Sequence, residues 1–186
     1  MKDLVRLRTS LSEEIESILN EQIQREAKAS AAYLAMATWC DNRGFTNSAD
    51  FFYHQSGEER EHMMKIYKYV NDVGGRSVSP EITGIQYDFD SLRSVFEEAL
   101  DQEVTNTQSI NRVVDACYKL KDYPTIEFMQ WFLKEQVEEV SSMSDLLAIV
   151  ERAVENPLWA EEYLAREGVG EDGEDPTAPP AAGGAL

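Results

Sequence analysis

One segment of this chain combines the spacing of a buried helix face with side chains that bind metal ions. Between positions 46 and 73, one set of residues recurs at alternating steps of three and four, the spacing of a helix face that packs on a core. This stripe consists of Phe52, Gln55, Glu59, His62, Ile66, Tyr69 and Val73. Since residues three apart share one helix face, Glu59 and His62 can bind one metal ion together. The stripe predicts that the pair faces inward.

Helical spacing continues along most of the chain and predicts an all-α fold. We expect four long helices and a short fifth one, over about 11–40, 46–73, 90–121, 124–155 and 158–166. Glycines follow the second segment, and Pro124 opens the fourth, where a first-turn proline is tolerated. Asn156 and Pro157 separate the fourth segment from the fifth.

The lengths of the connections predict how these helices are arranged. Two connections, from the first helix to the second and from the third to the fourth, have only a few residues, which is typical of antiparallel neighbours. Segment 74–89 can span about 53 Å when extended at roughly 3.3 Å per residue. The second helix is about 42 Å long at roughly 1.5 Å per residue. We therefore predict a four-helix bundle with one long crossover between the second and third helices, plus the short fifth C-terminal helix.

The chain should form one domain followed by a tail. A domain over residues 1–167 is long enough for a sizeable core, whereas residues 168–186 are rich in Gly, Pro, Ala and acidic residues and are expected to be disordered. Cys40 and Cys117 lack a Cys-x-x-Cys spacing and are expected to be buried free thiols. We find neither a bilayer-spanning apolar run nor a secretory signal, so we expect a cytoplasmic protein with no membrane partner.

The chain is strongly acidic. Its 35 acidic and 17 basic residues give a formal net charge of -18. Such a charge disfavours nucleic acid and anionic membrane surfaces as partners, and it makes cations the natural counterpart. Acidic surfaces are common, however, so the charge alone assigns no function.

Carboxylates interrupt the predicted core stripe of each long helix near its middle. They are Glu26 on the first helix, Glu59 beside His62 on the second, Glu103 on the third, and Glu135 and Glu139 on the fourth. Any one of them alone would more often reach solvent than bind metal. Several at one height are different, because unpaired buried carboxylates cost several kcal/mol. Bridging oxygens with an imidazole favour iron or manganese over structural zinc.

The motifs around these residues resemble those of bacterial non-haem ferritins. The resemblance covers about residues 10–166, and the motifs occur in order on all four helices. They are Leu19-Asn20-Glu21-Gln22 with Glu26, Tyr33-Leu34-Ala35-Met36 to Trp39-Cys40, Glu58-Glu59-Arg60-Glu61-His62-Met63, Asp122-Tyr123-Pro124-Thr125, Phe128-Met129-Gln130-Trp131-Phe132, and Glu135-Gln136-Val137-Glu138-Glu139. The ferritin-like fold is the four-helix bundle with one long crossover described above.

The resemblance implies a set of iron ligands. For the first ferroxidase iron they are Glu26, Glu59 and His62. For the second iron they are the bridging Glu59 with Glu103 and Glu139, and Gln136 matches the polar residue beside that pair. A nearby third iron site would be formed by Glu58, Glu135, Glu138 and Glu139. Tyr33 matches a tyrosine that supplies an electron or holds a ligand in place, although ordinary core packing explains it as well.

Differences from the motifs of related families show which branch the sequence resembles. A second Glu-x-x-His motif on the fourth helix would be typical of haem-binding bacterioferritins, but Glu138 occupies the position three after Glu135. We therefore expect no haem. Neither a rubredoxin-like set of four cysteines nor the ligand spacing of Dps proteins occurs. His54 falls outside the ligand stripe and is expected at the surface or in packing.

The resemblance implies a ferroxidase and iron-storage subunit. Such a protein oxidises Fe(II) to Fe(III) with dioxygen or hydrogen peroxide and deposits ferric mineral. Storage needs an enclosed space, so the resemblance also implies a homo-oligomeric shell of 24 subunits. Two alternatives stay open at this point. One is a di-iron oxidase or peroxidase that stores no mineral, and the other is a structural bundle that has lost its metal.

Overall fold

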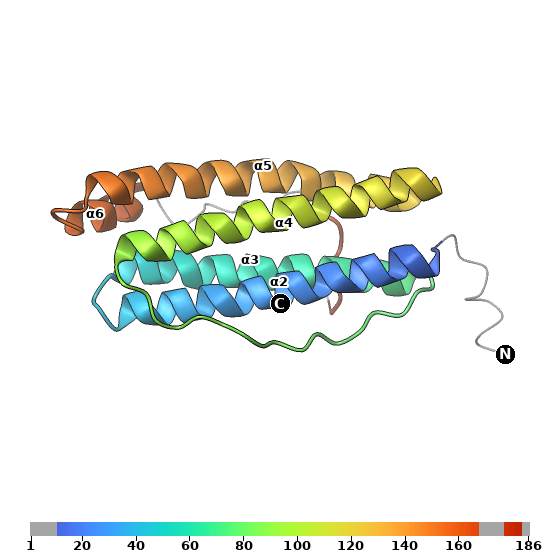
Figure 1. Ribbon diagram of the computed structural model, residues 1–186, viewed down its shortest axis with the longest axis horizontal. Coiled ribbons are helices and arrows are strands. Elements are labelled where there is room, and N and C mark those ends of the chain that lie inside the picture. Colours follow the sequence, from blue (N-terminus) through green and yellow to red (C-terminus); the bar gives the residue numbers. More distant parts are fainter. Residues whose placement is uncertain (1–10, 168–176, 184–186) are drawn as a thin grey trace.

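The computed structural model describes residues 11–167 and 177–183, and within these ranges all regular secondary structure is helical. The described residues form five helices, whose arrangement is shown in Figure 1. Their bounds are α2 Glu13–Asp41, α3 Thr46–Asp72, α4 Leu92–Leu120, α5 Tyr123–Arg152 and α6 Leu158–Glu167. The predicted all-α fold is confirmed, and no predicted helix end differs from the observed one by more than three residues.

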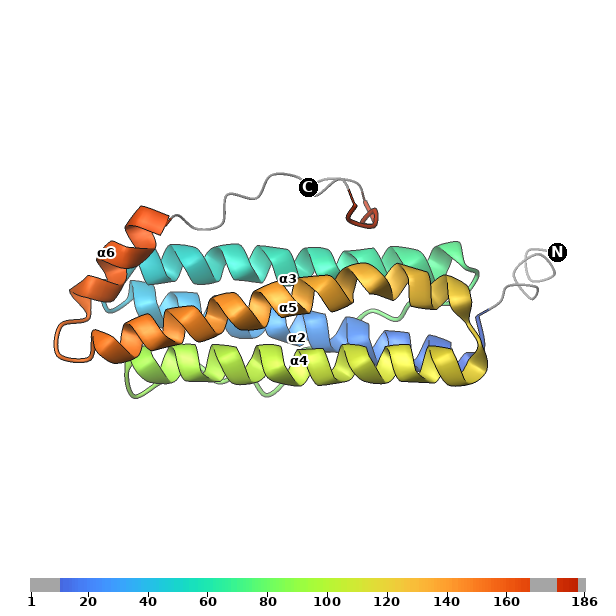
Figure 2. The same cartoon turned by 90° about the horizontal axis from the view of Figure 1, so that it is seen from above.

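The long helices form a bundle of two antiparallel hairpins, α2 with α3 and α4 with α5 (Figures 1 and 2). Residues 73–91 run along the length of the bundle from the end of α3 to the start of α4. Because this segment returns the chain to the opposite end, α3 and α4 are parallel. Helix α6 packs against α3 and α5 at one end. The predicted crossover topology is therefore confirmed.

Side chains at the helix starts explain where three of the helices begin. Ser12, Ser91 and Asp122 accept backbone N–H groups of the first turns of α2, α4 and α5, which otherwise have no partner within the helix. Ser91 and Ser94 form a reciprocal capping box. Helix α4 ends at Leu120, and the next residue, Lys121, has a φ of 58° that closes the turn before α5.

The start of α3 is capped by a side chain from another helix. Phe45 precedes α3 and has no capping side chain. Glu161 of α6 takes this role, because its two carboxylate oxygens accept the backbone N–H groups of Asn47 (2.7 Å) and Ser48 (3.1 Å). A carboxylate suits the partial positive charge of a helix N-terminus. Glu161 is buried, and its bonds hold α6 against the start of α3.

Two amide side chains of α2 hold the crossover. Asn20 donates to the carbonyl of Arg76 (3.0 Å) and accepts the N–H of Val78 (2.7 Å). One turn later, Gln24 makes the same pair of bonds with the backbone of Glu81. These bonds satisfy backbone groups that have no partner within a helix, and they align the crossover along α2.

Two apolar clusters fill the bundle, and charged side chains lie buried between them. Along α3, Phe52 belongs to the cluster nearer α6 and Ile66 to the cluster at the other end. Glu59 lies between them in sequence and is 2% exposed. Cys40 and Cys117 are buried free thiols, as predicted. The carboxylates therefore occupy the middle of the bundle.

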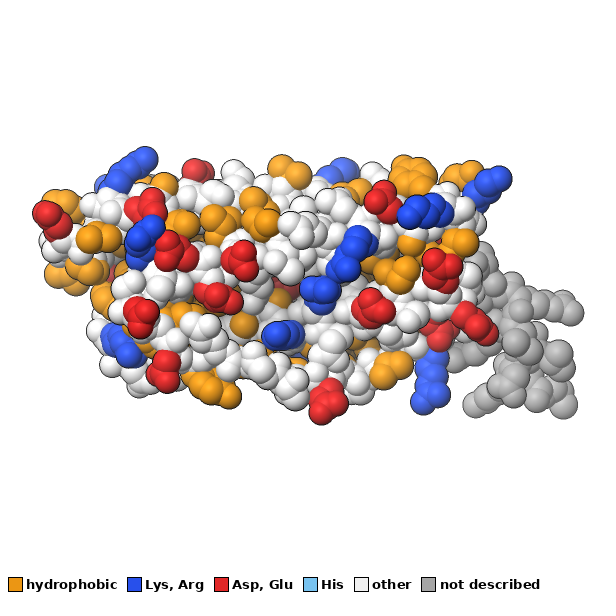
Figure 3. Space-filling model, viewed as in Figure 1, with side chains coloured by type: hydrophobic (Ala, Val, Ile, Leu, Met, Phe, Trp, Pro, Cys, Tyr) orange, Lys and Arg blue, Asp and Glu red, His pale blue; other side chains and the backbone are white. Residues whose placement is uncertain are grey.

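Acidic and basic side chains are interspersed over the face of the bundle shown in Figure 3. None of the helices in the described ranges has the length and apolar character that a membrane span needs. Of the predicted tail, residues 168–176 and 184–186 lie outside the described residues. Within the described part, the Ala182 N–H donates to the Met64 carbonyl of α3 at 3.1 Å. The boundary after residue 167 stays a prediction, as does the disorder of the tail.

Candidate metal centre

The first group of possible ligands comes from the α2–α3 hairpin. Oxygen or nitrogen atoms of Glu26, Glu59 and His62 all lie within 4.8 Å of one another, and all three side chains are buried. Glu59 and His62 are one turn apart on α3, as the stripe predicted, and Glu26 reaches them from α2. Glu59 Oε2 is buried without a hydrogen-bond partner in the described structure. An unpartnered buried carboxylate oxygen is what a cation would balance.

A second group joins the two hairpins. His62 also lies within 4.8 Å of Glu135 and Glu139, both on α5, by the same ligand-atom criterion. Glu139 is buried and Glu135 is half-buried. The sequence prediction had assigned His62 to the first iron and Glu135 to the third, so the contact between them was not predicted. The imidazole therefore stands where the two groups of carboxylates meet.

Glu103 of α4 is buried and is held by neutral donors. It accepts hydrogen bonds from the Tyr33 hydroxyl and from Gln136 Nε2 at 3.4 Å. Gln136 is itself oriented by the Thr107 hydroxyl, which donates to Gln136 Oε1 at 2.8 Å. Glu103 belongs to neither group of ligand atoms within 4.8 Å among the described residues. It is nevertheless close enough to raise the pKa of Glu59 by charge repulsion.

The buried carboxyl groups make one another harder to ionise. Burial raises the pKa of Glu59 well above its usual value, and the charges of Glu26 and Glu103 raise it further. Burial and the charge of Glu103 raise the pKa of Glu139 to about 9. Burial raises the pKa of Glu103 to about 7 despite the hydrogen bond from Tyr33. Without a cation, several of these groups hold protons at neutral pH.

His62 is neutral, which is the form that binds metal. Burial, followed by the charge of Lys65, lowers its pKa to about 3. The imidazole meets the ring of Trp131 edge to face, with 5.4 Å between centroids. Lys65 is itself buried: its ammonium lies 4.8 Å from the centroid of Trp131 and pairs with Glu61 at 2.5 Å. Trp131 therefore contacts both the imidazole of His62 and the ammonium group of Lys65.

An acidic pocket of about 340 Å³ opens beside the second group, between α3, α5 and α6. Its acidic lining includes the residues expected at the third iron site, Glu58, Glu135, Glu138 and Glu139. His54 also lines it, with Nδ1 at 3.3 Å from Glu58 Oε2. The expectation for His54 was a surface or packing position. The spacing of four between His54 and Glu58 places both side chains on one helix face. That spacing could have predicted that His54 lies beside Glu58 in this pocket.

Two buried amides that the sequence prediction did not assign to the site contact Glu26. Gln22 Nε2 donates to Glu26 Oε1 at 2.7 Å, and Asn106 Nδ2 donates to Glu26 Oε2 at 3.1 Å. Both amides are buried. Burial raises the pKa of Glu26, while hydrogen bonds from Glu59, Gln22 and Asn106 act in the opposite direction.

Comparisons with known proteins find the same family that the sequence motifs resemble. A family model described as "Ferritin-like domain" matches residues 16–153. Ferritin BfrB of Mycolicibacterium smegmatis is 41% identical over 180 residues, 95% of this chain and 97% of that protein. A bacterial non-heme ferritin of Staphylococcus epidermidis is 41% identical over 132 residues, 71% of this chain and 80% of that protein. A solved open pore ferritin from Archaeoglobus fulgidus superposes with a TM-score of 0.82 at 30% identity, covering 84% of this chain and 96% of that one.

Proposed function

The chain belongs to the ferritin family, and on that basis we propose that it is an iron-storage subunit that oxidises Fe(II) at the buried centre. The observation that carries the proposal is the meeting of Glu26, Glu59 and His62, with one Glu59 oxygen unpartnered. In a bundle core, such a constellation is costly to keep empty of cations. Iron is the substrate and the stored material.

We assign the two irons to overlapping ligand sets. Glu26, Glu59 and His62 bind the first. Glu59 bridges to the second, which Glu103 and Glu139 complete, with Gln136 beside it. The group formed by His62, Glu135 and Glu139 supports a third site nearby, and Glu58 and Glu138 line the pocket there. Tyr33 orients Glu103 through its hydroxyl.

The chemistry follows from the ligand types. Each Fe(II) loses one electron. Two such electrons, with two protons, reduce one dioxygen to one hydrogen peroxide or one hydrogen peroxide to two water molecules. Carboxylates favour the harder Fe(III) ion and so promote the loss of the electron. Protons leave the carboxyl groups when metal binds, because ligating oxygens must be deprotonated. The acidic pocket beside the centre would then receive the ferric product.

Storage also requires an enclosed space, which one bundle does not provide. We propose that the subunit assembles into a homo-oligomeric shell of 24 copies in the cytoplasm, with neither nucleic acid nor membrane as partner. In this shell, α6 would pack near a symmetry axis. The ferric mineral would accumulate inside.

Iron loading tests the proposal. Apo-protein receives Fe(II) in air while ferric absorbance is followed, and iron per particle and particle mass are then measured. We expect a large particle that holds far more than three irons per subunit. Glu26→Gln should slow the rapid phase about 10-fold or more, because one ligand loses its charge. Glu21→Gln, on an exposed position of the same helix, should match the wild type.

Each contrary result has a defined meaning. A small particle that holds only two or three irons per subunit would exclude storage and leave an oxidase. No ferric absorbance change in the wild type would exclude the ferroxidase itself. Equal rates for Glu26→Gln and Glu21→Gln would show that the centre lies elsewhere.

A further inference from the structure

Asn106 is a polar residue in a core position of α4. It lies one turn after Glu103 and is 5% exposed. A buried amide is costly unless both its donor and its acceptor atoms have partners, so its hydrogen bonds indicate what it does there.

Asn106, Gln22 and Glu26 form a closed triangle of hydrogen bonds. Asn106 Nδ2 donates to Glu26 Oε2 at 3.1 Å, and Gln22 Nε2 donates to Glu26 Oε1 at 2.7 Å. Gln22 Nε2 also donates to Asn106 Oδ1 at 2.6 Å. Each oxygen of Glu26 is therefore held by a different amide. The bond between Gln22 and Asn106 fixes the orientation of the two amides relative to each other.

The triangle limits rotation of Glu26 without using all its acceptor capacity. An ionised carboxylate has about four lone-pair directions over its two oxygens. Two are taken by the amides. Glu59 also hydrogen-bonds to Glu26, and the proton of that bond would leave when the two carboxylates bind a cation. The amides come from α2 and α4, so the orientation of Glu26 depends on how the two hairpins meet.

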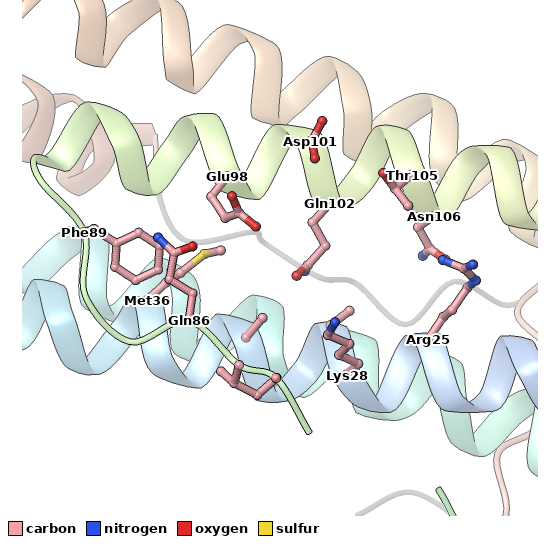
Figure 4. A pocket seen from close by; sticks show the side chains of 14 residues that line it. Arg25, Lys28, Met36, Gln86, Phe89, Glu98, Asp101, Gln102, Thr105 and Asn106 are labelled. Carbon is pink, nitrogen blue, oxygen red and sulfur yellow. The ribbon is translucent and has the colours of Figure 1, made fainter. Parts of the chain in front are cut away.

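Asn106 lies beside a cavity but does not direct its hydrogen bonds into it. This cavity of about 270 Å³ lies between α2, α4 and residues 84–89 of the crossover. Figure 4 shows Asn106 on α4 and Arg25 on α2 facing this cavity. An amide at such a wall can hydrogen-bond into the cavity. In this structure, both of its polar atoms instead bond to Glu26 and Gln22.

The opposite half of the centre is held differently. Glu103 is bonded by the Tyr33 hydroxyl and more weakly by Gln136, with 3.4 Å between the atoms. Asn106 is bonded only to the first half, through Glu26, among the hydrogen bonds of the described residues. An effect of Asn106 should therefore appear at one metal position and not at both.

We propose that Asn106, together with Gln22, is a positioning residue that holds Glu26 in the orientation in which it binds the first metal ion. This inference rests on the proposed ferroxidase centre and adds a residue to it. Hydrogen-bond partners of metal ligands commonly change metal affinity by about 10- to 100-fold when removed. A change of that size is measurable without iron oxidation.

The test is an anaerobic titration of the assembled apo-protein with Co(II), followed by its visible absorption. Asn106→Leu keeps the shape of the side chain and removes both hydrogen bonds. We expect one Co(II) site to weaken about 10-fold or more and the other to keep its affinity. Ser109→Ala is the matched control, because Ser109 is equally buried on α4 and does not bond to Glu26.

A double-mutant cycle separates positioning from a general structural effect. If Asn106 acts through Glu26, Asn106→Leu should weaken Co(II) binding much less in a Glu26→Gln background than in the wild type. Equal losses in the two backgrounds would overturn the inference. So would an Asn106→Leu titration that matches Ser109→Ala.

Two further outcomes also test the inference. If Asn106→Leu does not assemble, Gln22→Met removes the other donor to Glu26 and must weaken the same Co(II) site, or the inference is wrong. If the wild type binds no Co(II) at the centre, the proposed function fails, and the positioning role fails with it. Normal wild-type binding with an unaffected Asn106→Leu variant contradicts only the positioning role.

Discussion

At the scale of single residues, the buried carboxyl groups have two ways to exist in the core. They hold protons when no cation is present, and they ionise when one binds. Glu139 illustrates the first state, because burial and the charges of Glu103 and Glu58 raise its pKa to about 9. The folded apo-protein therefore keeps a proton there that the unfolded chain loses near the usual pKa of about 4.5.

The pH dependence of apo-protein stability follows from this difference. A raised folded-state pKa contributes stability that is complete below about pH 4.5 and is lost as pH rises toward 9. His62 has a pKa of about 3 in the folded protein and 6.5 in the unfolded chain, so its opposing contribution to the slope fades only about one pH unit above 6.5. Between about pH 7.5 and 8.5, the free energy of unfolding should therefore fall by on the order of 1 kcal/mol per pH unit.

Denaturant unfolding of chelator-treated protein across this pH range measures the slope. Glu139→Gln removes one titrating group and should flatten it. Glu127→Gln, at an exposed position of the same helix, serves as the control and should leave the slope unchanged. Stability that rises with pH in the wild type would contradict the assignment of protonated carboxyl groups to the core.

The sequence pointed to the buried charged residues of the candidate centre more readily than to its buried amides Gln22 and Asn106. Glu59 and His62 interrupt an apolar stripe, and a buried charge without a partner is an anomaly that the spacing reveals. Asn106 stands in an equally buried position, but an amide finds a partner in many environments. Its partner, Glu26, lies on a helix about 80 residues earlier, and only the packing of the two hairpins brings them together.

At the scale of helices, the ends were predictable where the signal is local. Ser91 caps α4 through its own first turn, and Pro124 stands at the start of α5. The cap of α3 was not predictable, because Glu161 comes from a helix more than 100 residues later. That long-range cap also holds the short helix α6 against the start of α3. A helix as short as α6 would be only marginally stable without such tertiary contacts.

Removing this cap should loosen the α6 end of the bundle. Glu161→Ala leaves the backbone N–H groups of Asn47 and Ser48 without their partner, at a cost of about 1–2 kcal/mol. The thermal unfolding temperature should fall by about 2–4 °C for each kcal/mol. Glu162→Ala, one position along and exposed, should have little effect. Equal unfolding temperatures for the two variants would show that the cap does not stabilise the fold.

At the scale of the whole molecule, the connection lengths alone selected the topology. Segment 74–89 is long enough to cross the bundle, and the structure shows that it does so along α2. The proposed ligands are then divided between the two hairpins: Glu26, Glu59 and His62 belong to one, and Glu103 and Glu139 to the other. Metal at the centre would therefore add bonds between two hairpins that otherwise meet through α2 and α4 and through aromatic contacts between α3 and α5.

This division predicts that metal stabilises the bundle as a unit. Free Co(II) at about 100 times its dissociation constant should add about 2.7 kcal/mol per independent site to the free energy of unfolding. Thermal unfolding with and without Co(II) measures the gain. Glu26→Gln in one hairpin and Glu139→Gln in the other should each reduce it, whereas Glu21→Gln should retain it in full. An equal gain in all four proteins would mean that Co(II) stabilises through surface carboxylates and does not join the hairpins.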